Sequence, residues 1–181
     1  MSSTVPEEYT NAPVEVQGLF PGLWWNTDRY EARKERVAEL EQQIPESDAV
    51  GIVDTDADGL ACEVVLRSKY DNPTVIQANG GSYAISLTHA LDIVSENTPE
   101  DVPVILADLS PDTTFSGLKA GLAKVSNPTY VYDHHDWEWS AKTSIECVVD
   151  EIVIDDDKCA AQIVLDEIHQ NNNEKLREFV N

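Results

Sequence analysis

Seven acidic and imidazole side chains that could do chemistry directly follow short apolar runs of the chain. They are Asp54, Asp56, Asp58, Asp108, Asp133, His134 and His135. The runs that precede them are 49–53, 102–107 and 128–132. If these runs are parallel strands, their carboxyl ends lie along one edge of a sheet, where open α/β proteins bind ligands. We therefore expect three distant turns of the chain to meet at one site.

The composition of this cluster points to divalent metal ions. Five carboxylates gathered at one edge would repel one another and raise each other's pKa, and bound cations remove that penalty. A mixture of carboxylate oxygen and imidazole nitrogen suits Mn²⁺, with Mg²⁺ or Co²⁺ as alternatives. The cluster contains no cysteine, and the three cysteines of the chain form no C-x-x-C pair, which argues against structural zinc.

Each motif also has a simpler interpretation when it is taken alone. The segment Asp54–Gly59 has the opening letters of an EF-hand loop, but the twelfth position, where that loop needs Glu, is Val65. Asp108 alone could cap a helix, and His134 with His135 could form a polar turn. Because all of these groups follow predicted strands, their joint placement favours the metal site.

Short apolar strands that alternate with helical patterns indicate an α/β fold. The spacing predicts strands over 49–53, 74–78, 102–107, 128–132 and 147–154, and helices over 28–44, 60–70, 83–95, 113–124 and 158–170. This alternation favours an open parallel five-stranded sheet with helices on both faces, a Rossmann-like arrangement. Residues 1–27 are predicted to be an extended N-terminal segment, and residues 28–181 a catalytic domain.

The charge of the chain is strongly unbalanced. Its 181 residues include 34 Asp and Glu against 12 Lys and Arg, which gives a net charge of −22. Such a surface repels nucleic acid at long range and suits a salty cytoplasm, where self-repulsion is screened. The chain starts without a signal-peptide pattern, and no apolar run reaches the ~18 residues of a membrane helix. We therefore expect a halophilic, cytoplasmic protein.

Three motifs resemble those of the DHH phosphoesterases. The segment Ile52–Leu60 resembles the first motif of that family, Leu106–Leu109 the second, and Val131–Asp136 the third, from which the family is named. Order and spacing agree, and the resemblance covers about residues 28 to 170. The family includes RecJ-type single-strand exonucleases, oligoribonucleases, cyclic-dinucleotide and nucleotide phosphodiesterases, and family II inorganic pyrophosphatases.

The resemblance implies a site for two metal ions. Asp56 would bind one ion, Asp58 and His134 would bind the other, and Asp108 would bridge both. Two such ions would activate a water molecule for attack on phosphorus, so that no nucleophilic side chain is needed.

The resemblance also implies roles around the two ions. His135 would hold a phosphoryl oxygen of the substrate, and Asp133 would orient a histidine from behind. Asp54 would be either a further ligand or a support for one.

The sequence departs from the family in two places. The pyrophosphatase branch carries a metal-binding His four residues before the first ligand Asp, where this chain has Ile52. That difference points toward the RecJ-like branch. Family members also supply another metal-binding Asp in a fourth motif and then a smaller C-terminal domain. Asp150 and the run 155–157 come too early for that motif, so we expect either a fragment or a reduced form without the second domain.

These features predict metal-dependent phosphodiester hydrolysis by a RecJ-like single-strand exonuclease or oligonucleotide phosphodiesterase. The expected partner is single-stranded nucleic acid or a short oligonucleotide, on which Trp137 and Trp139 could stack. The same tryptophans could instead cover the sheet edge or pack on another domain. Alternatives are a small-molecule nucleotide phosphatase, a cyclic-dinucleotide phosphodiesterase, or a non-catalytic binding subunit of a replication or repair complex.

Overall fold

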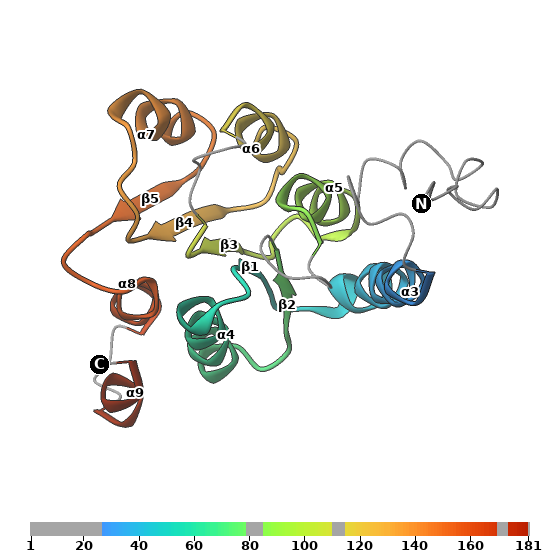
Figure 1. Cartoon of the computed structure of the whole chain (residues 1–181), viewed down its shortest axis with the longest axis horizontal. Helices are drawn as coiled ribbons and strands as arrows, with labels where there is room; N and C mark the ends of the chain where they lie inside the picture. Colours follow the sequence, from blue (N-terminus) through green and yellow to red (C-terminus); the bar gives the residue numbers. More distant parts are fainter. Residues whose placement is uncertain (1–26, 79–84, 110–114, 170–173, 181) are drawn as a thin grey trace, which may run out of the picture.

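A five-stranded parallel sheet forms the centre of the molecule. The computed structural model describes residues 27–78, 85–109, 115–169 and 174–180 (Figure 1). The strand order is β2-β1-β3-β4-β5, and each neighbouring pair is parallel. The strands are β1 Ala49–Val53, β2 Pro73–Gln77, β3 Val104–Ala107, β4 Thr129–Asp133 and β5 Glu151–Ile154. The predicted open parallel five-stranded sheet is confirmed.

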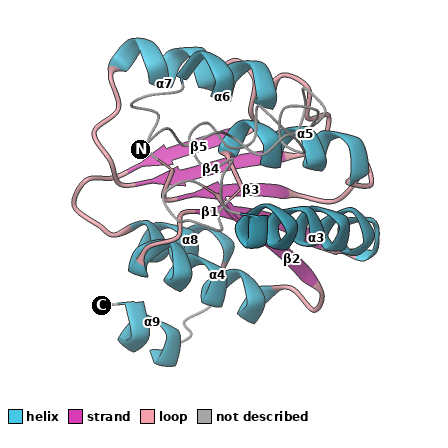
Figure 2. Cartoon of the chain, turned by 45° about the vertical axis from the view of Figure 1, so that its right-hand side comes forward, coloured by secondary structure: helices cyan, strands magenta, loops and turns pink. Residues whose placement is uncertain are grey.

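Helices cover both faces of this sheet, as the sequence predicts (Figures 1 and 2). Of the helices in the described ranges, four, with a short 3-10 turn η1 after the first, pack on one face through a shared apolar cluster. Two others pack on the opposite face, and a last short helix lies outside them. The first group is α3 Thr27–Gln43, η1 Ile44–Glu46, α5 Leu87–Asn97, α6 Phe115–Leu122 and α7 Trp139–Glu146. The second group is α4 Ala57–Lys69 and α8 Ala160–Ile168, with α9 Glu174–Val180 outside.

The two apolar clusters explain why β1 and β3 are apolar throughout. Neighbouring residues of a strand point to opposite faces, so a strand that is covered on both sides is favoured to be apolar at every position. In β1, Val50 and Ile52 belong to the cluster under α3 and α5, whereas Val53 belongs to the one under α4 and α8. In β3, Leu106 and Ile105 divide in the same way.

The structure adds elements that the sequence pattern did not indicate. The predicted strand 147–154 is shortened to β5, because residues 139–146 form α7 and the chain turns between the two. Among the residues of α7, Ile145 is buried, so the segment shows little of the periodicity that marks an amphipathic helix. The helix α9 was not predicted either.

Part of the N-terminal prediction lies beyond what the structure describes. The extended segment predicted over 1–27 falls outside the described residues except for Thr27, which begins α3. Within the described residues, no helix combines the length and the apolar character that a membrane crossing requires.

The junction between β1 and α4 is closely packed. Asp56 is the N-cap of α4, and its Oδ1 accepts hydrogen bonds from the backbone N–H groups of Asp58 and Gly59, both at 3.0 Å. A Cβ atom at Gly59 would lie 2.3 Å from the backbone oxygen of Asp54. Because backbone cannot step aside as a flexible side chain can, this position requires glycine.

The substitution Gly59→Ala should therefore destabilise the protein. We expect a loss of about 1–3 kcal/mol in the free energy of unfolding, because the extra methyl group forces apart the start of α4 and the end of β1. Urea unfolding followed by circular dichroism measures the loss. Gly117→Ala in α6 is the matched control, since its Cβ would meet Thr88 Oγ1 at 3.3 Å. Equal stability of both variants would contradict this account of the junction.

Candidate metal centre

The three predicted turns meet at the carboxyl end of the sheet. In the strand order, β3 lies between β1 and β4, so Asp108, which follows β3, stands at the middle of the edge. His134 Nε2 lies 3.3 Å from Asp108 Oδ1 and 3.7 Å from Asp58 Oδ2. His135 Nδ1 lies 3.9 Å from the same oxygen of Asp108. The topology thus brings together side chains from three segments that are distant in sequence.

Asp108 is the most unusual residue of this group. Its side chain is 1% exposed, and neither carboxylate oxygen has a hydrogen-bond partner among the described residues. Its backbone is left-handed, with φ of 60°, a conformation that Asp tolerates better than most residues. Burial, reinforced by the neighbouring Asp56, raises the pKa of this carboxyl from 3.8 to about 7. A buried carboxylate without a partner lowers the stability of the folded protein unless a cation binds to it.

Asp56 is held in the opposite electrostatic state. The hydrogen bond from the backbone N–H of Gly59 is the main cause that lowers the pKa of Asp56 below its usual value. The Asp58 N–H adds to this effect, and so does the contact with Asp108. One carboxyl of the neighbouring pair is thus stabilised as an anion, and the other is destabilised. A cation bound by both residues would stabilise the ionised form of Asp108 and would leave Asp56 ionised.

Asp133 fixes the geometry of the histidine segment. Its side chain is buried, and its Oδ1 accepts a hydrogen bond from the backbone N–H of His134 at 2.8 Å and lies 2.7 Å from His135 Nδ1. Its Oδ2 accepts a hydrogen bond from the indole N–H of Trp137. The contact at Nδ1 therefore fixes the orientation of the His135 ring beside Asp108.

The tryptophans predicted as stacking surfaces differ sharply. Trp137 is 7% exposed and packs in the apolar cluster that also contains Ile145 of α7, so the prediction that it stacks on bases is wrong, and of the two alternatives it is the covering of the sheet that agrees with this position. Trp139 is 80% exposed at the start of α7. The sequence did not predict the hydrogen bond from Trp137 to Asp133, because a spacing of four residues does not by itself indicate such a contact.

The remaining predicted residues, Asp58 and Asp54, have other contacts. The Asp58 carboxylate lies beside His134 and accepts hydrogen bonds from the backbone N–H groups of Ala160 and Ala161 at the start of α8. Asp54 Oδ1 accepts hydrogen bonds from the backbone N–H and the hydroxyl of Thr55. Among the described ion pairs, none joins Asp54 to the cluster.

The arrangement can hold a metal ion. Asp108, His134 and His135 each offer a ligand atom, and these atoms lie within 4.8 Å of one another. Both oxygens of Asp108 are buried without a hydrogen-bond partner among the described residues, and a cation would satisfy them. Asp155, Asp156 and Asp157 form a second acidic group, but two of them are exposed and no histidine joins them.

Comparisons with known proteins establish the fold and no more. No model of a known protein family matches the chain, and no curated protein matches it. An uncharacterized protein from Helicobacter pylori G27 gives a TM-score of 0.55 at 18% identity, covering 73% of this chain and 41% of that protein. An exopolyphosphatase-related protein from Bacteroides fragilis gives a TM-score of 0.43 at 13% identity, covering 77% and 44%. The chain spans less than half the length of each.

The unpartnered carboxylate predicts that Asp108→Asn stabilises the metal-free protein at pH 8. In EDTA we expect a gain of about 1–2 kcal/mol, or about 2–8 °C in Tm, because Asn keeps the left-handed backbone and removes the buried charge. The pKa of Asp108 is higher in the folded protein than in the unfolded chain. The free energy of unfolding therefore falls as the pH rises from about 4 toward 7, because the buried carboxyl becomes charged. The gain should therefore shrink at pH 5.

Thermal unfolding measured with Asp101→Asn as an exposed control tests this expectation. Adding Mn²⁺ should raise the Tm of the wild-type protein and leave that of Asp108→Asn unchanged. A lower Tm of Asp108→Asn in EDTA at pH 8 would show that the carboxylate has a partner that the geometry does not reveal.

Proposed function

We propose that the protein hydrolyses phosphodiester bonds with two divalent metal ions held at the carboxyl end of the sheet. The observation that carries this proposal is Asp108, a buried carboxylate without a hydrogen-bond partner among the described residues. It lies beside residues from the other two motifs that resemble those of the DHH phosphoesterases. Asp56 and Asp108 would hold one ion. Asp58, Asp108 and His134 would hold the other. Mn²⁺ suits these ligands best, with Mg²⁺ or Co²⁺ as alternatives.

The chemistry divides between the ions and the protein. When bound, divalent ions of this kind supply an activated water near neutral pH and neutralise charge on phosphoryl oxygens. The protein contributes orientation: Asp133 holds the ring of His135 at Nδ1, and this oriented imidazole would contact a phosphoryl oxygen. Asp133 is itself fixed by the indole N–H of Trp137. Asp54 would support the first turn through Thr55 rather than through a direct contact.

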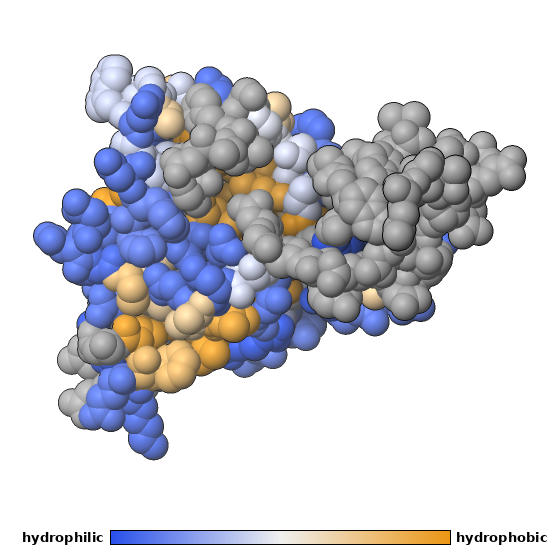
Figure 3. All heavy atoms as spheres, viewed as in Figure 1, coloured by the Kyte–Doolittle hydropathy of each residue, from blue (hydrophilic) through white to orange (hydrophobic). Residues whose placement is uncertain are grey.

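The substrate we propose is single-stranded nucleic acid or a short oligonucleotide. Trp139 follows His135 by four residues and is 80% exposed, so at most about 14 Å of extended chain separates the two. An exposed indole beside a phosphate-cleaving site can stack on a base of any type. Acids outnumber bases in the chain, so stacking would compensate for weak attraction of phosphates. On the face seen in Figure 3, hydrophilic residues lie beside exposed apolar ones.

The central test is hydrolysis in the presence of Mn²⁺. The protein should be incubated in molar KCl with labelled single-stranded DNA, short RNA, a cyclic dinucleotide and pyrophosphate. We expect loss of terminal nucleotides from a single strand. Asp108→Ala should reduce the rate by more than about 100-fold, because it removes the ligand shared by both ions. Asp101→Ala, at an exposed position, should leave the rate unchanged.

The same assay separates the alternatives. Equal activity of the wild-type protein and Asp108→Ala would identify a contaminating enzyme and refute the assignment. Cleavage of the small nucleotides alone would favour the small-molecule phosphatase. Absence of cleavage of every substrate, with a replication or repair protein co-purifying, would favour the non-catalytic subunit.

The stacking role predicts a selective effect of Trp139→Ala. We expect KM for a single-stranded oligonucleotide to rise about tenfold, because base stacking on an aromatic side chain is lost. Trp139→Phe should retain most of the affinity. KM for an abasic strand of the same length should not change in either variant. Phe179→Ala in α9, which also removes an exposed aromatic ring, is the control. Equal KM values for all variants would exclude the stacking surface.

A further inference from the structure

The helix α8 begins directly against Asp58. The backbone N–H of Ala160 donates to Asp58 Oδ2 at 2.8 Å, and that of Ala161 donates to Oδ1 at 3.0 Å. The first N–H groups of any helix lack an acceptor within the helix. A side chain from α4, about a hundred residues away in sequence, supplies both acceptors here. Asp58 therefore caps α8 from outside that helix.

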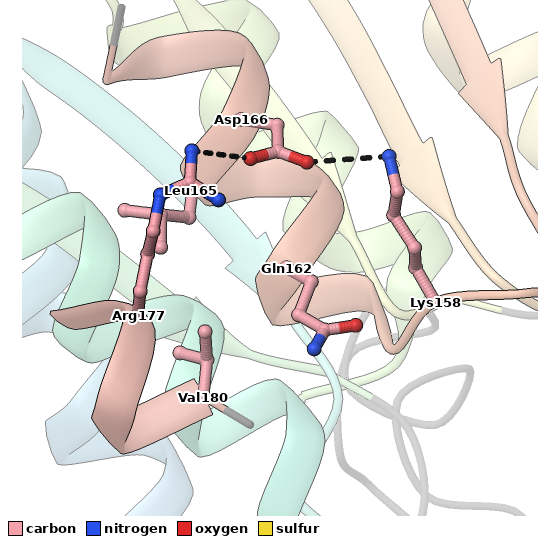
Figure 4. Close-up of a pocket in the computed structure, with 6 residues that line it drawn as sticks. All are labelled: Lys158, Gln162, Leu165, Asp166, Arg177 and Val180. Carbon is pink, nitrogen blue, oxygen red and sulfur yellow. Dashed lines mark ion pairs between the residues drawn. The ribbon is translucent and has the colours of Figure 1, made fainter. Parts of the chain in front are cut away.

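The first turn of α8 is itself held in place. Cys159 N–H donates to the side chain of Gln162 at 3.2 Å, and Ala160 and Ala161 are buried against α4. Lys158, in the turn that precedes α8, lies 3.2 Å from Asp166 of that helix (Figure 4). The two amides that face Asp58 thus occupy a defined position.

The turn before α8 and the helix after it are tied to the same carboxylate. Arg177 of α9 lies 2.8 Å from Asp166 Oδ1, and Lys158 lies near Asp166 Oδ2 (Figure 4). Lys158 is also 3.3 Å from Asp155, in the segment that leaves β5. These exposed pairs add little stability, but they join α8 to its neighbours on both sides.

Asp58 also faces the metal centre. The oxygen that accepts from Ala160, Oδ2, is the one that lies 3.7 Å from His134 Nε2. An ionised carboxylate offers two lone pairs on each oxygen, so one amide bond per oxygen leaves capacity for a cation. The positive end of the α8 dipole favours a negative charge at this position. The carboxylate therefore stands between the helix and the metal ligands.

We propose that the backbone amides of Ala160 and Ala161 position Asp58 as a metal ligand, so that the N-terminus of α8 is part of the support of the metal centre. This inference rests on the proposed function, because it requires a metal ion beside Asp58 and His134. It makes metal binding and the order of the first turn of α8 reciprocal: each stabilises the other.

A proline at position 160 isolates the Ala160 amide. Ala160 is the first residue of α8, where proline fits a helix because its missing N–H has no partner within the helix. The preceding residue, Cys159, has φ of −76° and ψ of 158°, a conformation that a following proline accepts. Ala160→Pro should thus keep the helix while removing the donor to Asp58. Ala160→Gly, which retains the N–H, is the matched control.

Calorimetric titration of the metal-free full chain with Mn²⁺ tests the inference. We expect the affinity of one Mn²⁺ site to fall by about 10- to 100-fold in Ala160→Pro and to stay near the wild-type value in Ala160→Gly. Circular dichroism confirms that both variants are folded. Wild-type affinity in a folded Ala160→Pro variant would overturn the inference while leaving the proposed function intact. Failure of the wild-type protein to bind Mn²⁺ would overturn both.

Hydrogen exchange in the wild-type protein gives a second reading that needs no substitution. Amides at the start of α8 should exchange more slowly after Mn²⁺ is added, whereas those at the start of α5, which is capped by Ser86, should not change. This measurement decides the question if Ala160→Pro does not fold. Unchanged exchange at α8 with Mn²⁺ bound would overturn the inference.

Discussion

Repulsion among carboxylates at one edge of the sheet is the constraint on which this structure depends. Asp56, Asp58, Asp108 and Asp133 converge there, and Asp108 is buried without a hydrogen-bond partner among the described residues. The fold can carry this cost because the sheet is covered on both faces by apolar clusters. A local arrangement of this kind is typical of functional sites, and here it suits the cation site that we propose.

The four carboxylates are treated differently by the protein around them. Backbone N–H groups at the start of α4 donate hydrogen bonds to Asp56, and those at the start of α8 donate to Asp58. Asp133 accepts hydrogen bonds from the backbone N–H that follows β4 and from the indole N–H of Trp137. In a parallel α/β fold, helices that follow strands begin at the carboxyl edge, so their positive ends face this site. Asp108 accepts no such hydrogen bond in the described structure, so it is the carboxylate whose charge a bound metal ion would neutralise.

The two tryptophans show how the same residue type can take opposite roles within three positions. Trp137 is buried and anchors Asp133, and through it the ring of His135. Trp139 is exposed at the start of α7, where it can meet a ligand. One indole thus stabilises the site from within, and the other extends it toward the substrate that we propose.

The sequence by itself determined the five strands, most of the helices and the edge at which the acids meet. Apolar runs and helical spacing are local, and the right-handed crossover rule for parallel strands places the residues after β1, β3 and β4 on one side. Tertiary structure alone decided which carboxylate oxygens have donors, that Trp137 is buried while Trp139 is exposed, and that Ala160 and Ala161 face Asp58. The same holds for α7, whose pattern is too weak to be read locally. Such contacts join residues far apart in the chain, so they depend on how helices dock on the sheet, which no local pattern encodes.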